Sequence, residues 1–497
     1  MPTVATIDPV TRLEGHLKIE VKVDTVNGVQ QVVDAWATGT MFRGFESILV
    51  NRHPWDAQHI TERICGVCPV SHGMAAVLAL ESAARITAPA NGRIMRNLVL
   101  GANYIQSHIL HFYHLSAPDF IKGPDMPPWQ PSWSADRRID QSTTNTLVNH
   151  YVTALEMRRK AHEMGAIFGA RLPHPPAFTQ GGITTVPTAA AISRFKTYLN
   201  ELTSFITNVY VPDVELLTSV YQDYFGIGRG VRNLLAYGVF DLDSAGNTKL
   251  LKRGRITGGS NSVQSVDVNA IAEQVTYSWY ADSTNNLKPS VGRTTPQYPK
   301  NNAYSWLKAP RYNGVAYEVG ALARMWVNGN YRGGISVMDR HLARANEARI
   351  VALAMQSWIG QIRVGQSVRT QASVPTSATS YGLTEAPRGA IGHWLQISGS
   401  KIARYQVVTP TCWNASPRDG AGKRGPIEEA LIGTPVQNIN EPVEVVRVIH
   451  SFDPCLSCAV HVMRPAEGAT VFALGHYHGE DEIHEHDHAH VHEHSHG

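Results

Sequence analysis

Two Cys-x-x-Cys pairs, one near each end of the chain, are the strongest constraint on how this sequence can fold. They are Cys65/Cys68 and Cys455/Cys458 in 497 residues, and the fifth cysteine, Cys412, stands apart from both pairs. Two residues between thiolates let both sulfurs of a tight turn face one metal ion. Four thiolates suit soft metals such as Zn, Cu(I), Ni or an iron–sulfur cluster. Because zinc ribbons keep their pairs about 15–20 residues apart, only a completed fold can bring these two pairs together.

The cysteines alone leave three interpretations open. The pairs by themselves favour a structural zinc site. Their wide separation favours a metal-containing active site at the heart of a large subunit. A redox dithiol is the third option, but the chain has two pairs where one would serve and lacks a compact βαβ context.

Charge and hydropathy exclude several classes of protein. The chain has 44 Lys and Arg against 41 Asp and Glu, and 43% of its residues are hydrophobic. This balance argues against a nucleic-acid partner. No stretch approaches 18 consecutive apolar residues, and residues 1–9 lack a basic region followed by an apolar one. We therefore expect a globular chain with no direct membrane span and no export signal of its own.

Hydrophobic periodicity predicts a mainly α (α+β) fold. Helical patterns recur at about 91–116, 146–170, 188–223 and 341–363, and good helix formers follow residue 72. These long helices indicate a bundle core. Short strands at 17–23 and 29–36 around Asn27-Gly28 predict a hairpin within a small N-terminal α/β layer, residues 1–60. Between about 225 and 335, Gly, Asn, Ser, Thr and aromatic residues predict a β/loop-rich elaboration of the bundle.

The C-terminal segment differs from the rest of the chain. Residues 476–497 contain nine His interleaved with six acidic residues, a composition that cannot build a core. The interruptions favour a native extension over an engineered tag. Its role is either divalent-metal binding or none beyond a solvated tail.

Further motifs surround the cysteine pairs. They include Thr-Arg-Leu-Glu-Gly-His before the first strand and Glu-Ala-Pro-Arg-Gly-Ala in the C-terminal third. The full set covers residues 8–16, 42–46, 62–72, 111–119, 385–394, 413–419, 425–436 and 453–461. With these motifs the chain resembles the large, catalytic subunit of nickel-iron hydrogenases, and most closely the uptake type. The resemblance implies that family's large-subunit fold.

The resemblance implies a bimetallic centre held by the four paired cysteines. Cys65 and Cys455 would bind nickel alone, while Cys68 and Cys458 would also bridge to an iron that carries carbon monoxide and cyanide. Glu14 matches the family's proton-transfer glutamate and would take a proton from the Cys455 sulfur. Thiolates are polarisable donors, which suits this redox chemistry.

The same comparison implies roles for residues around the centre. Arg388 would lie over the open side of the metals, with Asp119 and Asp453 as its carboxylate partners and Pro387 lining the same pocket. A buried guanidinium needs such partners. Thr411 would donate a hydrogen bond to a cyanide.

A second, hard cation is also implied. Glu46, His461 and the backbone carbonyl of Val407 match ligands of a magnesium ion, whose other positions would be filled by water. His72 matches a histidine whose N–H points at the diatomic ligands and the bridging sulfur. Cys412 has no matching role and is expected to be a small buried side chain.

The resemblance also implies partners and processing. Only one cysteine remains outside the pairs, so iron–sulfur clusters must belong to a small subunit in an obligate heterodimer. That subunit's export signal would place the enzyme in the periplasm or at the membrane rather than in the cytoplasm. Nickel-insertion proteins and a maturation endopeptidase are expected, with cleavage after His461. The catalytic domain would then span residues 1–461, and residues 462–497 would be a maturation peptide with the His-rich extension.

We therefore expect an oxidoreductase that converts H2 reversibly to protons and electrons. The nearest alternative is a hydrogen-sensing regulatory hydrogenase of the same fold, which a cleavable C-terminal extension disfavours. A structural zinc protein and a quinone-binding respiratory subunit are the alternatives from other classes. Retention of Glu14, Arg388 and all four paired thiols argues against both.

Overall fold

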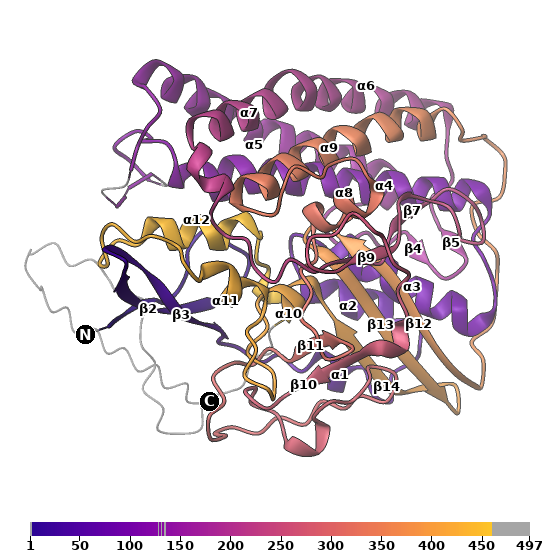
Figure 1. The fold of residues 1–497 in the computed structure, drawn as a ribbon. Helices are drawn as coiled ribbons and strands as arrows, with labels where there is room; N and C mark the ends of the chain where they lie inside the picture. Colours follow the sequence, from indigo (N-terminus) through magenta and orange to yellow (C-terminus); the bar gives the residue numbers. More distant parts are fainter. Residues whose placement is uncertain (1, 128, 131, 134–135, 460–497) are drawn as a thin grey trace, which may run out of the picture. The chain divides into compact units, whose positions relative to one another are not determined.

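The computed structural model describes residues 2–127, 129–130, 132–133 and 136–459, apart from the side chains of residues 458 and 459. The expected domain end at residue 461, the magnesium ligand His461 and the whole of 462–497 lie outside this range. Long helices and several antiparallel sheets both contribute to the described part, so the fold is mixed α+β (Figure 1).

The predicted N-terminal hairpin is confirmed. Strands β1 (Thr3–Ile7), β2 (Leu17–Val26) and β3 (Val29–Gly39) form an antiparallel sheet in that order. Alternate residues of β2 are buried, as expected of a sheet with one face on the core. Asn27 and Gly28 both have positive φ, 52° and 82°, which is the backbone of a two-residue hairpin turn. Two short helices follow, α1 (Phe45–Ile48) and α2 (Asp56–Thr61).

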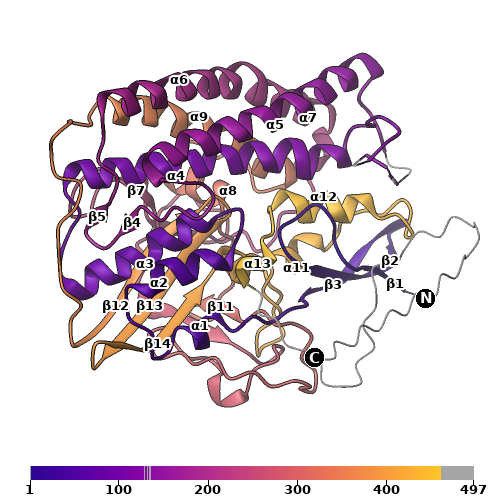
Figure 2. The ribbon, with the colours of Figure 1, turned by 180° about the vertical axis from the view of Figure 1, so that it is seen from behind.

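The long helices lie where periodicity predicts them. They are α3 (Pro69–Ala84), α4 (Ala90–Leu110), α5 (Gln141–Gly169), α6 (Ala189–Phe205), α7 (Val211–Val220) and α9 (Val337–Ile359). Side chains cap three N-termini, Asp140 for α5, Thr188 for α6 and Ser336 for α9. Helices α4, α5, α6 and α9 pack side by side in both views, and α4 contacts α5 and α9 (Figures 1 and 2). This packing builds the largest hydrophobic cluster of the protein.

Residues 225–335 hold short strands separated by loops. These strands are β6 (Leu234–Ala236), β7 (Val239–Asp241), β8 (Lys249–Leu251), β9 (Gly254–Ile256), β10 (Ile271–Gln274) and β11 (Ala309–Tyr312). They pair in twos, β6 with β9, β7 with β8 and β10 with β11. Helix α8 (Ala321–Asn328) follows and packs on α9. Upstream, β4 (Phe178–Thr179) and β5 (Gly182–Ile183) form a two-residue hairpin pair.

A three-stranded sheet near the C-terminus was not foreseen from the sequence. It consists of β12 (Ser377–Ala386), β13 (Gly389–Ser398) and β14 (Lys401–Val408), all antiparallel. Most of β13 is buried on both faces, so its sequence lacks the alternation that marks a half-exposed strand. Helix α3 lies directly on β12. At the point of contact a Cβ on Gly382 would lie 2.1 Å from the carbonyl oxygen of Ala75.

Four short helices complete the described chain: α10 (Pro410–Asn414), α11 (Pro426–Leu431), α12 (Val443–Ser451) and α13 (Leu456–Ala459). Among the helices that the structure describes, none combines the length and apolarity that a bilayer crossing needs.

Candidate metal centre

The first cysteine pair lies in the loop that leads into α3. Cys65 is extended, and Cys68 occupies the N-cap position of α3, whose first residue is Pro69. The backbone N–H groups of Val67 and Cys68 point at the Cys65 sulfur, at 3.3 and 3.1 Å. Backbone donors at a helix N-terminus favour a thiolate. The loop therefore prepares Cys65 to act as a charged ligand.

The second pair begins just after α12. Cys455 forms a parallel β-bridge with Glu14, and the N–H of Leu456 donates to the Glu14 carbonyl oxygen at 2.6 Å. The Cys455 N–H donates to the Thr411 hydroxyl oxygen at 2.9 Å. These two contacts fix a residue from the C-terminal end of the chain against the N-terminal segment.

Three sulfurs from the two pairs meet in the interior. The Cys65 Sγ lies 3.3 Å from Cys455 Sγ and 3.0 Å from Cys68 Sγ, and each of the three residues is 1% exposed. In the described part of the chain none of the three takes part in a disulfide, and their sulfurs lie within 4.8 Å of one another. Sulfurs bound to one metal ion at about 2.3 Å lie roughly 3 to 4 Å apart. The cluster therefore fits a shared soft metal. Cys458, the expected fourth ligand, has its side chain outside the described part.

Arg388 lies beside this cluster, in the turn between β12 and β13. Its Nε donates to Asp453 Oδ1 at 3.0 Å and its Nη1 to the Ser107 hydroxyl at 3.3 Å. Burial opposes the guanidinium charge, but Asp453 and the three thiols raise the pKa of Arg388 well above its ordinary value. The side chain is 2% exposed and stays charged next to the sulfurs.

A buried ion-pair network holds the turn that carries Arg388. Arg324 donates to the backbone carbonyls of Ala386 and Pro387, at 2.9 and 2.7 Å. The same guanidinium is paired with Glu347 and Glu385. Glu385 belongs to a motif seen in the sequence, but no local pattern marks Arg324 or Glu347 as buried or shows that the three charges pair.

The expected pairing of Asp119 with Arg388 is wrong in this structure. Asp119 forms an ion pair with Arg12 and accepts a hydrogen bond from His450 Nδ1 at 2.6 Å. Burial would raise the pKa of Asp119, but Arg12 and His450 together hold it well below its ordinary value. The carboxylate is already satisfied by these two partners, and Asp453 alone compensates Arg388 among the described carboxylates.

Glu14 lies half-buried at the edge of the cluster. Burial and the nearby Cys65 raise its pKa, while Arg388, the Gly66 N–H and the Ser457 side chain lower it. The effects of burial and Cys65 are larger, so the net pKa of Glu14 is raised. A carboxyl whose pKa is raised in this way accepts a proton more readily than an ordinary exposed glutamate.

Two buried polar atoms around the cluster, His72 Nε2 and Asp453 Oδ2, make no hydrogen bond to the described residues. The His72 ring is fixed from its other side, where Nδ1 lies 3.2 Å from His393 Nε2. Burial lowers the pKa of His72 to about 4, so the ring is neutral. Buried polar groups normally have partners. These orphaned atoms are therefore consistent with a bound group that completes the site.

Glu46 and Val407, two of the expected magnesium ligands, lie together. The contact is between the Val407 N–H and Glu46 Oε1, at 2.8 Å. The Lys308 ammonium lies 3.6 Å from Glu46 Oε2 and 3.4 Å from Glu273 Oε2. The sequence analysis missed Lys308 and Glu273. A buried lysine beside two carboxylates was not predictable from sequence spacing.

Comparison with known proteins decides the family. A model described as nickel-dependent hydrogenase matches residues 43–126, 125–334 and 330–461, and a second, described as HoxL-like, matches residues 5–33. The chain belongs to the nickel-dependent hydrogenase family. It is an oxidoreductase of that family, as the sequence motifs predicted.

Relatives of this hydrogenase subunit match it over nearly its whole length. The large subunit of the periplasmic [NiFeSe] hydrogenase of Desulfomicrobium baculatum is 44% identical, over 93% of this chain and 96% of the relative. The uptake hydrogenase large subunit of Bradyrhizobium diazoefficiens is 33% identical, over 92% and 95%.

Solved hydrogenase structures lead to the same family as the sequence relatives. The Ni-Fe-Se hydrogenase of D. vulgaris Hildenborough, in its as-isolated oxidised state, matches this hydrogenase subunit with a TM-score of 0.90 and 44% identity. That match covers 93% of this chain and 100% of the other. The fold is therefore that of the hydrogenase large subunit.

Proposed function

We propose that this chain is the catalytic subunit of a nickel-iron hydrogenase that oxidises H2 reversibly to two protons and two electrons. The observation that carries the proposal is the buried cluster of three thiols from opposite ends of the chain, next to a paired guanidinium. Thiolates at this spacing suit nickel, and the family is nickel-dependent.

Four cysteines would hold the centre. Cys65 and Cys455 would bind nickel alone, and Cys68 and Cys458 would bridge to an iron with carbon monoxide and cyanide ligands. Such a centre, when bound, supplies the electron transfer and the place where H2 is split. The distances between the three described sulfurs support this assignment.

Glu14 would receive the proton that leaves the centre by way of the Cys455 sulfur. The β-bridge between the two residues supports this role, since it keeps their backbones in contact. The raised pKa of Glu14 supports it further, because the carboxylate then binds a proton more readily than an ordinary exposed glutamate does.

Arg388, Thr411 and His72 would bind the diatomic ligands and the open side of the centre. Asp453 fixes the Arg388 guanidinium, whose Nε and Nη2 both face Oδ1 of that carboxylate. The Thr411 oxygen accepts from Cys455, and its own O–H remains to donate to a cyanide. His72 Nε2 is likewise without a partner among the described residues. Pro387 lines the same pocket, in the turn that Arg324 holds.

Magnesium would bind to Glu46, the carbonyl of Val407 and His461, with water in the remaining positions. The ordered Glu46 carboxylate supports this assignment, because Val407 and Thr294 both donate hydrogen bonds to it. Lys308 lies on the same carboxylate and would order the surrounding water.

Electrons would pass to an iron–sulfur small subunit in an obligate heterodimer. Cys412 is the one cysteine left outside the pairs, which is too few to hold a cluster in this chain. The names of relatives, periplasmic in Desulfomicrobium baculatum and quinone-reactive in Wolinella succinogenes, favour a periplasmic or membrane-associated enzyme. Nickel-insertion proteins and an endopeptidase acting after His461 would mature the chain, removing residues 462–497.

Metal analysis combined with infrared spectroscopy of the purified complex tests the proposal. We expect nickel, iron and the bands of bound carbon monoxide and cyanide. The Cys455→Ala variant should lose nickel, while Cys412→Ala should keep it, because burial raises the pKa of Cys412 to about 11 and leaves an inert thiol. One zinc per chain with no such bands would refute the proposal. An intact centre with very slow turnover would instead identify a hydrogen sensor.

A further inference from the structure

Three buried side chains form a hydrogen-bonded chain between α3 and the β12–β14 sheet. His72 Nδ1 lies 3.2 Å from His393 Nε2, and His393 Nδ1 lies 2.8 Å from the Tyr405 hydroxyl. Each of the three residues is at most 1% exposed. His72 follows Cys68 by four residues, and the charge of Cys65 acts on its ring. The chain therefore connects a phenol in the sheet with an imidazole beside the thiol cluster.

Backbone packing holds the three side chains together. His72 and Ala75 are three residues apart in α3 and share one face of the helix. The Ala75 carbonyl oxygen lies against Gly382, and Gly382 is the register partner of His393. Tyr405 of β14 lies diagonally across from His393 in the register of β13 and β14. The helix and the sheet thus fix His72, His393 and Tyr405 in one row.

Both imidazoles of the chain are neutral. Burial lowers the pKa of His72 to about 4 and lowers the pKa of His393 well below its ordinary value. Burial also raises the pKa of Tyr405, so the phenol keeps its proton. A neutral imidazole has one N–H donor and one acceptor nitrogen. Donors and acceptors therefore alternate along the chain, which leaves two possible directions.

The phenol decides between these directions. Among the described residues, the Tyr405 hydroxyl has His393 Nδ1 as its hydrogen-bond partner. If the phenol accepted from His393, its own proton would be buried without an acceptor, which is unfavourable. If it donates, His393 carries its proton on Nε2 and donates to His72 Nδ1. The proton of His72 is then on Nε2, the buried atom that has no partner among the described residues.

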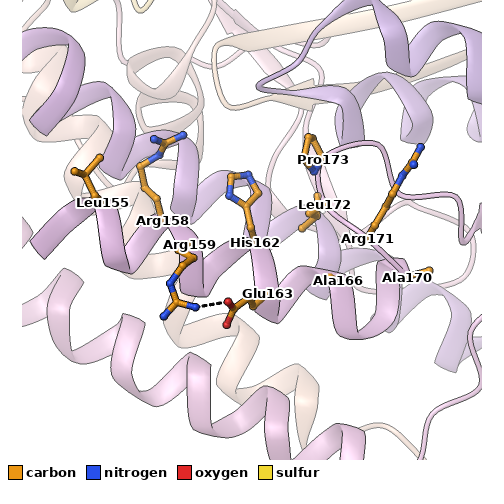
Figure 3. Close-up of a pocket in the computed structure, with 10 residues that line it drawn as sticks. All are labelled: Leu155, Arg158, Arg159, His162, Glu163, Ala166, Ala170, Arg171, Leu172 and Pro173. Atoms are coloured by element: carbon orange, nitrogen blue, oxygen red, sulfur yellow. Dashed lines mark hydrogen bonds and ion pairs between the residues drawn. The ribbon is translucent and has the colours of Figure 1, made fainter. Parts of the chain in front are cut away.

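Exposed polar pairs impose no such order. Figure 3 shows Arg159 and Glu163, two residues that line a cleft of about 520 Å³ at the C-terminal end of α5. Their side chains are 54% and 36% exposed, so water can replace either partner at little cost. The chain from Tyr405 to His72 is closed to solvent. Each of its protons therefore has one favourable position, and successive hydrogen bonds polarise one another.

We propose that Tyr405 is a positioning residue, whose hydroxyl fixes the order of hydrogen bonds through His393 and thereby holds His72 Nε2–H as a donor toward the metal centre. The inference rests on the proposed function, because the group that accepts from His72 would belong to the nickel-iron centre. With that acceptor in place, every donor of the chain is satisfied. The opposite order would present a bare nitrogen lone pair to the centre.

Infrared spectroscopy of the purified holoenzyme tests the role of the phenol. The forms compared are the native chain, Tyr405→Phe, His72→Phe and the control Tyr381→Phe, which removes a hydroxyl from a 46%-exposed residue of β12. His72→Phe removes the donor and should shift bands of the bound cyanide and carbon monoxide. We expect Tyr405→Phe to shift the same bands in the same direction by a smaller amount, because it weakens the donor. The control should keep the native bands.

A merely structural role for Tyr405 would lower the Tm of Tyr405→Phe without moving these bands. Native bands in Tyr405→Phe, alongside shifted bands in His72→Phe, would therefore overturn the proposal. Native bands in His72→Phe would overturn it as well, because His72 would then not be a donor to the centre.

Neutron diffraction from the perdeuterated native holoenzyme keeps the proposal testable if a variant folds poorly. We expect deuterium on Nε2 of both His72 and His393, and the Tyr405 deuterium directed at His393 Nδ1. Deuterium on Nδ1 of either imidazole would overturn the proposal. A native chain without nickel and without cyanide or carbon monoxide bands would instead refute the proposed function, and the deuterium positions would still show whether Tyr405 donates to His393.

Discussion

The residues around the thiol cluster differ in their charge and in how readily they bind a proton. Arg388 stays positive beside the sulfurs because Asp453 compensates it, and Glu14 has a raised pKa because it is half-buried near Cys65. The positive and the proton-carrying groups thus lie close to the thiols. Substitutions that keep the shape of one of these side chains and change its charge are therefore the most direct tests of its role.

Glu14→Gln is such a substitution. It preserves the backbone bridge to Cys455 while removing the carboxyl that we propose carries the proton. We expect the metals to remain in place and the rate of hydrogen–deuterium exchange with water to fall about 10²- to 10⁴-fold, the usual effect of losing a general acid–base group. Isotope exchange by mass spectrometry measures this. A native rate in the variant would mean that another group carries the proton.

Glu62 gives a pH-dependent prediction. Burial raises the pKa of this 1%-exposed carboxyl to about 8, with Gln58 as its hydrogen-bond donor. The folded chain therefore binds one more proton than the unfolded chain between pH 4.5 and 8. Folding stability from this group is present below that window and is lost as pH rises through it.

The Glu62→Gln variant should remove that dependence. We expect the native Tm to fall relative to the variant from pH 5 to pH 8, equivalent to at most about 4 kcal/mol. The exposed Glu215→Gln serves as the control. Parallel Tm curves for native chain and variant would show that Glu62 is ionised at the lower pH.

The sequence indicated that the two cysteine pairs meet, because they lie in contiguous motifs, and three of their sulfurs do lie together in the described structure. It failed where contacts join distant segments. Asp119 was placed with Arg388, but Arg12 and His450 occupy its carboxylate. Local spacing cannot reveal such competition between partners.

Helix α3 and the β12–β14 sheet position the site, because their backbones are in close contact. Helix α3 begins at Pro69, next to Cys68, and β12 leads into the turn of Arg388. The two elements touch at Gly382. Contact between backbones leaves no flexible side chain to absorb a displacement, so the relative placement of ligand and guanidinium is rigid.

Gly382→Ala should disturb this placement. The new Cβ would lie 2.1 Å from the Ala75 carbonyl oxygen and 2.5 Å from the Ala79 nitrogen. We expect destabilisation of about 3 kcal/mol and a lower nickel content, measured by thermal unfolding and metal analysis. The neighbouring Tyr381, 46% exposed, provides the control Tyr381→Ala. Equal effects of the two variants would contradict the close packing.

The long helices were predictable at this scale because each is long and strongly periodic. Strand β13 and the second half of β12 were not, since burial on both faces there removes the alternation that identifies a strand. The helix bundle could therefore be predicted from the sequence, whereas the sheet whose turn carries Arg388 could not.

For the whole molecule, the centre joins the two ends of the described chain. Cys65 and Cys68 come from the N-terminal part, Cys455 from the C-terminal part, and Arg43 bridges the carbonyls of Ile64 and Ser457. The hydrophobic cluster that contains most of the bundle's buried side chains includes none of these three cysteines.

Metal removal should therefore loosen the ends and spare the bundle. We expect peptides covering 12–16 and 452–457 to exchange deuterium faster in the metal-free chain than in the loaded one. Peptides from α4 and α9 should be unchanged. Exchange that rises uniformly across the chain would show that the metals stabilise the fold as a whole.

The bridge between Glu14 and Cys455 brings together segments that are translated far apart in time, and this fixes the order of steps in biosynthesis. Residues 65 and 455 are 390 positions apart. At the usual 5–20 residues per second, a ribosome completes the second thiol about 20 to 80 s after the first. During that interval the nascent chain carries half a ligand set. In the proposed site, the full set of nickel ligands therefore exists only after both cysteine pairs have been translated, and the first pair has to stay reduced and unoccupied until then.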